Sequence, residues 1–595
     1  MAIRTVLVSQ GTCCKSAGAE QVYVALKKEL TEVGLEVLLK TPGCHGFSEI
    51  DPVVVIEPEG ILYAKVKVED VPEFVRSLGS ENHPVERLFY RDPATGRGIP
   101  YQREIPFFKR QQRTILNNCG ILEPRNIEDY LEVGGYQGLQ KALLEMTPPQ
   151  VVAEVNRSGL RGLGGAGFPT GKKWEMCAAA PGEIKYVICN ADEGDPGSFQ
   201  DRSVLEGDPH GVLEGLLLAG YAVGAQEGYL YVRAEYPLAI KNLQIAINQA
   251  REKGFVGENI LGRGFNFEIK IFQGAGAFVC GEETALIQSL QGQRGMPYPR
   301  PPYPVIAGLH GRPTLIDNVK TLASIRWIIN KGAEWLAARG TETSKGTAVF
   351  SITGKVANCG LVEVPMGITM REIIYEIGGG IPGGKKFKAV QTGGPSGGCL
   401  PEALLDTAID FDTLRAAGSM MGSGGMVVMD EDTCMVDTAR YFLDFSLKES
   451  CGQCAPCRLG TMQMHEILTR ITQGNGKLSD LDLMIELSQG VAQGSLCGLG
   501  KTAPNPVLTT LRYFRDEYVA HIVEKRCPSL SCKALISFSI NPDKCKGCSK
   551  CVKACPVKAI SGNKKEAHMI DMGKCTKCGV CREVCPDAFG AVECR

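Results

Sequence analysis

The chain has 595 residues, too many for a single hydrophobic core, so several domains are expected. Its 44% apolar and 22% charged residues are typical of globular proteins, and its net charge of −1 argues against binding nucleic acid or an anionic membrane surface. No stretch approaches the roughly 20 apolar residues of a membrane helix, and the N-terminus lacks the features of a signal peptide. We therefore expect a cytoplasmic protein without membrane insertion, whose grouped cysteines are reduced rather than paired in disulfides.

The N-terminal stretch alternates apolar strand, helix and strand, in RTVLVS, EQVYVALKKELTEV and LEVLLK. Cys13 and Cys14 follow the first strand in GTCCKSAGA, and Cys44 follows the second strand in TPGCHGFSE. These three thiols are candidate soft ligands for a metal.

A glycine-dense loop, RGLGGAGFPTGKKW, spans residues 161–174. Glycines let the backbone approach a ligand and offer N–H groups to phosphate oxygens, and Lys172 and Lys173 would neutralise that phosphate. The loop matches neither the GxGxxG dinucleotide fingerprint nor a Walker loop, and a simple turn is the alternative. By itself it is a weak indication of a nucleotide site.

Two later segments repeat a scheme of strand, turn and acidic residues. The apolar strand Tyr186–Cys189 ends where open α/β sheets bind ligands. The loop after it contains Asn190, Asp192 and Glu193. In FEIKIFQGAGAFVCGEETALIQSL, a strand and a glycine turn lead to a helix start at Glu282 and Glu283, where acidic residues also favour the helix dipole. Three such segments in succession favour one large pocket over three separate turns.

A cysteine array follows in ESCGQCAPCRLG, where Cys451, Cys454 and Cys457 have the spacing C-x2-C-x2-C. A fourth ligand is missing locally, and Cys497 in GSLCGLG is the expected donor. The segments TARYFLDFSLKES, LGTMQMHEILTRI and PVLTTLRYFRDEYVAHIVEK are predicted to be helical, so we expect a helical bundle that carries a cluster.

Two nearly identical arrays lie near the C-terminus, CKGCSKCVKAC at 545–555 and CTKCGVCREVC at 575–585, each followed by proline. Such a run binds paired [4Fe–4S] clusters in bacterial ferredoxins, with its fourth cysteine on the other cluster, whereas structural zinc favours two CxxC pairs. The first cluster is assigned Cys545, Cys548, Cys551 and Cys585. The second cluster is assigned Cys575, Cys578, Cys581 and Cys555. The protein is therefore expected to move electrons.

The glycine loop, the NADEG loop and the GAGAFVCGEE segment, in this order, resemble the flavin-bearing, NADH-oxidising subunit of respiratory complex I, from about residue 110 to 535. The resemblance implies an FMN cofactor, with a [4Fe–4S] cluster beside it. It places the dinucleotide on Phe168 and gives Glu283 the catalytic position beside the nicotinamide carboxamide and ribose. The implied FMN contacts are Gly162, Gly164, Lys173, Asn190, Asp192, Glu193, Gly281, Glu282 and, nearby, Asn318.

The dinucleotide site departs from this family at one position. Where relatives commonly have lysine-Pro-Pro-phenylalanine, this chain has Arg300 and Tyr303 around the two prolines. Tyr303 still offers an aromatic face for adenine. The guanidinium of Arg300 suits the 2′-phosphate of NADPH, and it equally suits an ordinary pyrophosphate or ribose contact. Both NADH and NADPH therefore stay open as substrates.

The N-terminal stretch resembles the thioredoxin-like [2Fe–2S] domain of related soluble enzymes, which takes two cysteine ligands from each of two loops. Ser48 stands where the last cysteine is expected, and serine binds iron poorly beside thiolate. The domain therefore either binds a cluster through Cys13, Cys14 and Cys44, or it has lost the cluster and serves for docking.

A last group, His521, Cys527 and Cys532 in HIVEKRCPSLSCK, would bind zinc if a fourth ligand comes from elsewhere. Buried free cysteines are the alternative. Resemblance to electron-bifurcating relatives favours a zinc ion that fixes the hinge before the C-terminal domain. The remaining cysteines, expected to be core residues, include Cys177, Cys280, Cys359, Cys399 and Cys434.

The expected fold is multidomain, α/β and α+β. Its predicted parts are a thioredoxin-like domain at 1–85, an FMN- and NAD(P)-binding α/β core at 86–345, a small β-grasp (SLBB-like) domain at 346–425, a helical [4Fe–4S] bundle at 426–535, and a bacterial 2[4Fe–4S] ferredoxin-like domain at 536–595.

This order of domains resembles the beta subunit of electron-bifurcating [FeFe]-hydrogenases. The implied function is that of a diaphorase, which exchanges hydride between NAD(P)H and FMN and passes single electrons through [4Fe–4S] clusters to ferredoxin and partner subunits. We find no hydrogen-activating motif or molybdenum site in the sequence, so the implied partners are a catalytic iron–sulfur subunit and a small [2Fe–2S] thioredoxin-like subunit. The alternatives are a bifurcating transhydrogenase or NAD(P)-linked formate dehydrogenase subunit, or an electron-wiring subunit without nucleotide turnover.

Overall fold

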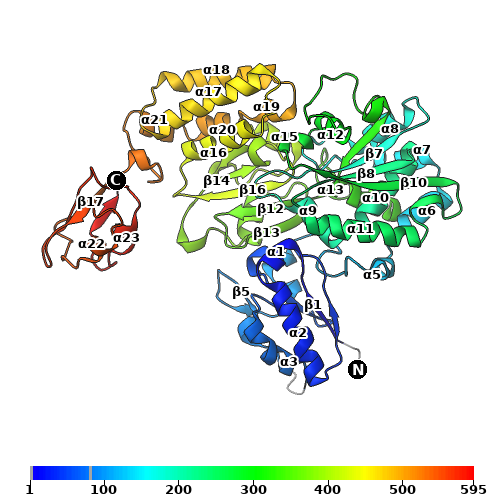
Figure 1. Ribbon diagram of the computed structural model, residues 1–595, viewed down its shortest axis with the longest axis horizontal. Coiled ribbons are helices and arrows are strands. Elements are labelled where there is room, and N and C mark those ends of the chain that lie inside the picture. Colours follow the sequence, from blue (N-terminus) through cyan, green and yellow to red (C-terminus); the bar gives the residue numbers. More distant parts are fainter. Residues whose placement is uncertain (1–3, 80–82, 595) are drawn as a thin grey trace.

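The computed structural model describes residues 4–79 and 83–594. Two five-stranded sheets occupy the middle of the molecule, a helical bundle lies above the second sheet, a smaller N-terminal sheet lies below, and the C-terminal segment stands apart at one end (Figure 1). Within the described ranges, no helix combines the length and apolar character needed to cross a bilayer.

The first sheet, which we call the central sheet, has the strand order β11-β7-β8-β10-β9. Its strands are β7 (Tyr186–Ala191), β8 (Glu227–Arg233), β9 (Gly257–Ile260), β10 (Phe265–Gly274) and β11 (Thr314–Asn318). Neighbours from β11 to β10 run parallel, and antiparallel β9 closes one edge. The apolar run of β7 is buried because helices such as α10 (Pro209–Val223) and α13 (Val319–Lys331) pack against the sheet.

Parallel strands bring the predicted ligand loops together at one edge of this sheet. Asn190 and Asn318 are register partners at the carboxyl ends of β7 and β11. Beyond the carboxyl end of β10, the chain makes a short turn and enters α12 (Glu283–Leu290). The edge where these loops meet is the one at which open α/β sheets bind ligands.

The second sheet has the strand order β13-β12-β16-β14-β15. Its last strand in the sequence ends at Asp430, five residues beyond the predicted domain limit at 425. Its strands are β12 (Thr347–Gly354), β13 (Gly360–Pro365), β14 (Phe387–Thr392), β15 (Gly398–Pro401) and β16 (Gly425–Asp430). The bundle above it contains α16 (Met435–Lys448), α17 (Ala455–Thr472), α18 (Ser479–Gly494), α20 (Asn505–Tyr513) and α21 (Arg515–Ile522).

The helical prediction for PVLTTLRYFRDEYVAHIVEK is wrong at Phe514, where the helix breaks, and at its last three residues, which follow the end of α21. Phe514 has φ −132° and ψ 32°, which is not helical, so α20 and α21 are separate helices. The break lets the buried Tyr518 hydroxyl lie 2.7 Å from Thr510 Oγ1 on the preceding helix. A buried hydrogen bond and the packing of Tyr518 therefore outweigh the local preference for a single helix.

The N-terminal domain has a four-stranded sheet of order β2-β1-β3-β4. Its strands are β1 (Thr5–Val8), β2 (Leu38–Lys40), β3 (Val54–Glu57) and β4 (Ile61–Tyr63). With α2 (Ala19–Val33), they confirm the predicted strand, helix and strand. The domain docks closely on the molecule above it, because a Cβ added at Gly43 would lie only 2.4 Å from the Gly207 Cα atom.

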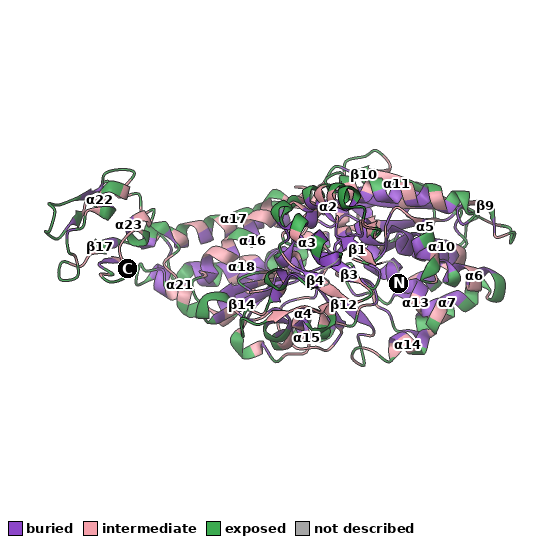
Figure 2. Cartoon of the chain, turned by 90° about the horizontal axis from the view of Figure 1, so that it is seen from below, coloured by how far each residue is buried: buried purple, intermediate pink, exposed green. Residues whose placement is uncertain are grey.

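The C-terminal domain consists of two short antiparallel strand pairs and two short helices. Strand β17 (Phe538–Ile540) pairs with β20 (Val592–Cys594), and β18 (Ile560–Ser561) pairs with β19 (Met569–Ile570). The helices are α22 (Lys550–Ala554) and α23 (Val580–Glu583). Figure 2 shows far more exposed surface here than on the buried helices α10 and α13 of the central domain.

Candidate functional site

A cavity of about 680 Å³ opens at the carboxyl edge of the central sheet, and we call it the main pocket. All three predicted ligand segments contribute to its wall. Of the predicted flavin and nucleotide contacts, the structure gathers around it Gly162, Gly164, Phe168, Lys173, Asn190, Gly281, Glu282, Glu283, Arg300, Tyr303 and Asn318. The wall also includes Asp317 and Gly498, which sequence reasoning missed; Asp317 is adjacent to Asn318 in the motif PTLIDNVKTLA.

A half-buried lysine places a positive charge in the wall of the main pocket. Lys173 Nζ donates to the Ile316 carbonyl at 2.6 Å and lies 3.2 Å from Asp317 Oδ1 and 3.3 Å from Glu283 Oε1. Burial opposes its charge, but Asp317 and Glu283 outweigh burial and raise the pKa of the ammonium group. Lys173 is therefore a fixed cation that faces the pocket.

The two glutamates at the start of α12 have different environments. Glu282 is the N-cap, and its carboxylate accepts from the backbone N–H groups of Thr284 and Ala285, so the helix-start alternative is confirmed for this residue. Glu283 pairs with Lys173 and is one-third exposed at its side chain. Arg300 lies 3.6 Å from a carboxylate oxygen of each glutamate.

Asp192 and Glu193 differ from the other predicted flavin contacts, because neither is among the residues that line the main pocket. Glu193 accepts from the backbone N–H groups of Asp201 and Arg202 at the start of α9 (Gln200–Gly207). Asp192 is buried 3.8 Å from Arg233. Burial raises the pKa of Asp192 to about 7. Burial also raises the pKa of Glu193 to about 7, and the nearby negative charge of Asp201 is the second cause.

The first cysteine array closes around a small cavity of about 10 Å³ beside α12 and α17. Its wall contains all four predicted ligands, Cys451, Cys454, Cys457 and Cys497. A larger space of about 570 Å³ joins this array to the main pocket, because Cys454 and Cys497 share its wall with Glu282, Arg300 and Tyr303. The remote cysteine predicted from the sequence therefore lies beside the other three.

One cluster set of the C-terminal domain is brought together in the same way. A cavity of about 10 Å³ is lined by Cys555, Cys575, Cys578 and Cys581, the set that combines three cysteines of the second array with the last cysteine of the first. In the other set, Cys551 is buried, Cys545 and Cys585 are half-buried and Cys548 is exposed.

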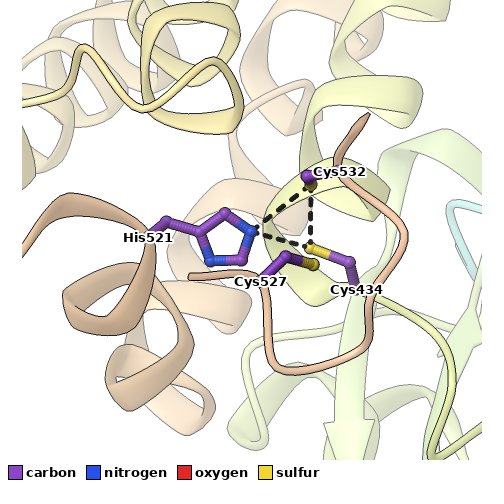
Figure 3. A group of neighbouring side chains, drawn as sticks. All are labelled: Cys434, His521, Cys527 and Cys532. Atoms are coloured by element: carbon purple, nitrogen blue, oxygen red, sulfur yellow. Dashed lines mark hydrogen bonds between the residues drawn. The ribbon is translucent and has the colours of Figure 1, made fainter. Parts of the chain in front are cut away.

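A fourth group lies in the helical bundle, where α16 begins and the chain leaves α21 (Figure 3). Cys434, His521, Cys527 and Cys532 are all buried, and their ligand atoms lie within 4.8 Å of one another. His521 Nε2 is 3.4 Å from Cys434 Sγ and 3.3 Å from Cys532 Sγ, while its Nδ1–H donates to the Glu517 carbonyl at 2.7 Å. This bond leaves Nε2 free to bind a metal.

Cys434 is the fourth ligand that sequence reasoning did not identify. It was expected to be an ordinary core residue, and it is buried, but it also completes the group at His521. It lies 87 positions before His521, so no local spacing connects the two. Three thiols and one imidazole within this distance have the composition of a structural zinc site.

Only two of the three N-terminal cysteines lie in one candidate metal-binding group. Cys14 and Cys44 lie with Asp51, whose carboxylate is within 4.8 Å of both thiols. Cys13 accepts instead from Arg202 Nη2 at 3.3 Å, across the contact with α9. Ser48 stands where the resemblance led us to expect a cysteine, and its buried hydroxyl has no hydrogen-bond partner among the described residues.

Four protein families match separate parts of the chain. The Nuo51 FMN-binding domain matches residues 155–327, and the SLBB domain matches residues 349–400. The NADH-ubiquinone oxidoreductase-F iron-sulfur binding region matches residues 437–521, and the 4Fe-4S dicluster domain matches residues 538–591. The molecule is therefore a multidomain α/β protein with an FMN-binding domain, an SLBB domain and iron–sulfur domains.

Curated proteins extend this likeness over most of the chain. The NADP-reducing hydrogenase subunit HndC of Solidesulfovibrio fructosivorans is 56% identical over 460 residues, which are 77% of this chain and 94% of that protein. A subunit of the NADH-quinone oxidoreductase of Rhizobium meliloti (strain 1021) is 46% identical over 414 residues, 70% of this chain and 98% of that protein.

A solved structure agrees with these relatives. The crystal structure of an NAD⁺-reducing [NiFe]-hydrogenase in the H₂-reduced state matches with a TM-score of 0.62 and 28% identity, covering 87% of this chain and 84% of that one. The chain therefore belongs to the family of FMN- and iron–sulfur-containing, NADH-oxidising subunits that NADH-quinone oxidoreductases and NAD(P)-linked hydrogenases share.

Proposed function

We propose that this NAD(P)H-oxidising subunit exchanges hydride between NAD(P)H and FMN and passes single electrons through three [4Fe–4S] clusters to ferredoxin and to partner subunits of an electron-bifurcating hydrogenase. The observation that carries the proposal is the contact between the main pocket and the first cysteine array. Glu282, Arg300 and Tyr303 line both the main pocket and the adjoining space that reaches Cys454 and Cys497. A ligand held in the pocket therefore has a cluster site beside it.

The residues of the main pocket fit FMN. A Cβ added at Gly164 would lie 3.0 Å from Asn318 Cβ, and one at Gly281 would lie 3.3 Å from the Asp192 carbonyl, so both positions in the pocket wall are tight for any residue other than glycine and present backbone. When bound, FMN accepts two electrons from the nucleotide and releases them one at a time. Lys173 offers a fixed positive charge to its phosphate or ring oxygens, and Asn190 and Asn318 offer amide groups at the strand ends.

Glu283 and Phe168 are proposed to orient the nucleotide. Phe168 is 46% exposed on the wall of the main pocket, which leaves its ring face free to stack on a flat base. Glu283 is held by Lys173 on one side and Arg300 on the other, so its carboxylate is fixed where the carboxamide and ribose would lie. Hydride transfer needs no protein acid or base, so orientation is the role assigned to Glu283.

Arg300 is proposed to contact the phosphates of the nucleotide. Its guanidinium lies over the Tyr303 ring at 5.8 Å and between the two glutamates, on the boundary of the main pocket and the adjoining space. A planar donor fork at this place suits either the 2′-phosphate of NADPH or the pyrophosphate of both nucleotides. The name of HndC, NADP-reducing hydrogenase subunit, favours NADPH as a substrate to test beside NADH.

Asp192 and Glu193 are proposed to stabilise the loop after β7, which carries Asn190, without contacting FMN themselves. Glu193 holds the start of α9, and the Asp192 carbonyl lies against Gly281. The Glu193 side chain and the Asp192 backbone therefore shape the loop that presents Asn190. This role replaces direct contact with FMN and follows from their absence among the residues that line the main pocket.

The metal sites outside the main pocket are proposed as follows. The first [4Fe–4S] cluster takes Cys451, Cys454, Cys457 and Cys497; the second and third take the two crossed C-terminal sets. A zinc ion is held by Cys434, His521, Cys527 and Cys532 and fixes the chain where it leaves the bundle. The five predicted domains are proposed with one change of limit: the small β domain extends from 425 to Asp430, because β16 belongs to its sheet.

The partners proposed are a catalytic iron–sulfur subunit such as a hydrogenase, a small [2Fe–2S] thioredoxin-like subunit, and ferredoxin, in the cytoplasm. The family relatives HndC and the NAD⁺-reducing hydrogenase are named as hydrogenase proteins, which favours this setting over a transhydrogenase or a formate dehydrogenase. An electron-wiring subunit without turnover is disfavoured, because such a subunit needs neither Lys173 nor Glu283 in the main pocket.

The test is anaerobic absorbance of the chain reconstituted with FMN, iron and sulfide, after mixing with NADH and separately with NADPH. Bleaching of the flavin and cluster bands by one nucleotide is the expected result and identifies the preferred substrate. Lys173→Met should weaken FMN retention, whereas Lys172→Met, which changes an exposed lysine paired with Glu175, should not. No bleaching by either nucleotide, with FMN and clusters bound, would contradict the proposal.

A further inference from the structure

The N-terminal domain brings two cysteine thiols and one aspartate carboxyl group to one buried point. Cys14 lies in α1 (Thr12–Ser16), Cys44 follows β2, and Asp51 follows a short helical turn that contains Ser48. Their ligand atoms lie within 4.8 Å of one another. Cys14 is fully buried, Cys44 is 2% exposed, and the Asp51 side chain is 1% exposed.

The polar atoms around this point are buried without satisfied hydrogen bonds. Both carboxylate oxygens of Asp51, the Ser48 hydroxyl and His45 Nε2 have no hydrogen-bond partner among the described residues. A buried carboxylate without a hydrogen bond is strongly unfavourable, and native proteins rarely contain one. A cation between Asp51 and the two thiols would satisfy this arrangement.

His45 supports the carboxylate and does not complete the ligand set. Its Nδ1 accepts from the Phe47 backbone N–H at 3.0 Å, so in the neutral ring the proton is on Nε2. Nε2 lies 4.0 Å from Asp51 Oδ1. An imidazole N–H beside a metal-bound carboxylate is a usual means of orienting the ligand.

The same residues do not fit the [2Fe–2S] cluster that the thioredoxin-like resemblance implies. A two-iron cluster needs four ligands in two pairs, but Cys13 contacts Arg202 and Ser48 replaces the last cysteine. A single tetrahedral zinc ion, with bonds of about 2.3 Å to sulfur and about 2.0 Å to oxygen, keeps its ligand atoms about 3.5–3.8 Å apart. Three ligand atoms within 4.8 Å therefore match one ion with little movement.

We propose that Cys14, Cys44 and Asp51 bind a single Zn²⁺ ion in the N-terminal domain, in place of an iron–sulfur cluster, with the fourth position left to Ser48 or water. Two thiolates and one carboxylate are ligands that zinc accepts, and the ion adds no redox chemistry. The site is separate from the one at Cys434, which lies in the helical bundle.

The position of this ion gives it a structural task. The loop of Cys14 and the loop of Cys44 are the ones that dock on α9: Thr12 N–H donates to Glu206 Oε2 at 2.8 Å, and Gly43 lies against Gly207. The first turn of α9 is held by Glu193 of the flavin loop. An ion that ties the two loops together would therefore hold the N-terminal domain in its docked position.

The test is metal analysis of the full-length chain, reconstituted with iron, sulfide and FMN, exposed to Zn²⁺ and separated from free metal. Cys44→Ala should lose about one zinc ion per chain with no loss of iron or sulfide. Asp51→Asn keeps the shape of the side chain and should lower zinc affinity by more than about 10-fold in competition with a chelator. Cys359→Ala, which changes a half-buried cysteine outside both candidate sites, should retain all of its zinc.

Combining Cys44→Ala with Cys434→Ala should remove zinc additively, because the two sites are independent. Unchanged zinc in Cys44→Ala would overturn the proposal. Loss of about two iron and two sulfide ions from the same variant would also overturn it, in favour of a [2Fe–2S] cluster. Unchanged zinc affinity in Asp51→Asn would remove the carboxylate from the ligand set and with it the three-ligand site.

Discussion

The central domain and the C-terminal domain both carry candidate redox sites, but they differ in how much protein surrounds those sites. In the central domain, α10 is buried along almost its whole length, and the main pocket is formed by strand ends and by a lysine that two carboxylates hold. The C-terminal domain has strands of two or three residues, short helices and an exposed Cys548.

This difference indicates what each domain needs in order to fold. A domain of about 60 residues buries too little apolar surface to be stable by packing alone, so metal ligation has to contribute. The central domain belongs to a large hydrophobic core that extends into the second sheet, so we expect its pocket to be formed before the cofactor binds. We therefore expect the clusters to stabilise the C-terminal domain, whereas FMN adds mainly function to the central domain.

The largest effect is expected from removing cluster ligands in the C-terminal domain. The double variant Cys551→Ala/Cys581→Ala takes one ligand from each assigned set, and amide protection across residues 538–594 should fall by about 100-fold or more. Hydrogen exchange should show unchanged protection in α10 and α13. Cys594→Ala, in the same domain but in neither set, is the control. Retained protection in the double variant would show that packing alone holds the domain.

A second large effect is expected at the hinge between the bundle and the C-terminal domain. Cys434→Ala removes one of four buried ligands, so the chain should lose about one zinc ion and the segment 521–535 should exchange its amides faster. Zinc analysis and hydrogen exchange measure both effects. Cys399→Ala removes a fully buried thiol of β15 outside the group and should leave the zinc content unchanged. Equal zinc in the two variants would exclude Cys434 as a ligand.

A smaller effect, on function alone, is expected in the main pocket. Glu283→Ala should lower kcat/KM for the preferred nucleotide by about 10–100-fold, because a hydrogen bond from a charged group contributes about 1.5–3 kcal/mol. Iron, sulfide and FMN contents should not change, since the pocket is formed by the core. Glu175→Ala, an exposed glutamate of α8 (Thr170–Ala179), is the control. Normal turnover of Glu283→Ala would remove its orienting role.

The smallest effect is expected in the pH dependence of stability. Burial raises the pKa of Asp192 from 3.8 to about 7, so between these values the native state binds more protons than the unfolded state, and stability falls as pH rises. Asp192→Asn removes this loss, so it should raise the melting midpoint at pH 8 and change it little at pH 4. Asp406→Asn, an exposed aspartate paired with Arg371, should not reproduce this pattern. An equal shift at both pH values would contradict the raised pKa.

The cysteine arrays and the three ligand segments could be predicted from the sequence because local spacing determines them. In C-x2-C-x2-C, one loop supplies three ligands, so their identity does not depend on the rest of the fold. The glycine loop, the NADEG loop and the GAGAFVCGEE segment were likewise recognisable, and parallel strands then place all three at one sheet edge. The crossed assignment of Cys555 to the second array agrees with the cavity that it lines.

Only the tertiary structure decided which distant residues complete a site. Cys434 joins His521 across 87 positions, and Asp51 joins Cys14 and Cys44 where a second cysteine pair was expected. Asp192 and Glu193 are also not among the residues that line the main pocket, although their sequence position suggested contact with FMN. The physical reason is the same in each case: helix and strand packing brings remote side chains within ligand distance, and no local pattern of residues records that packing.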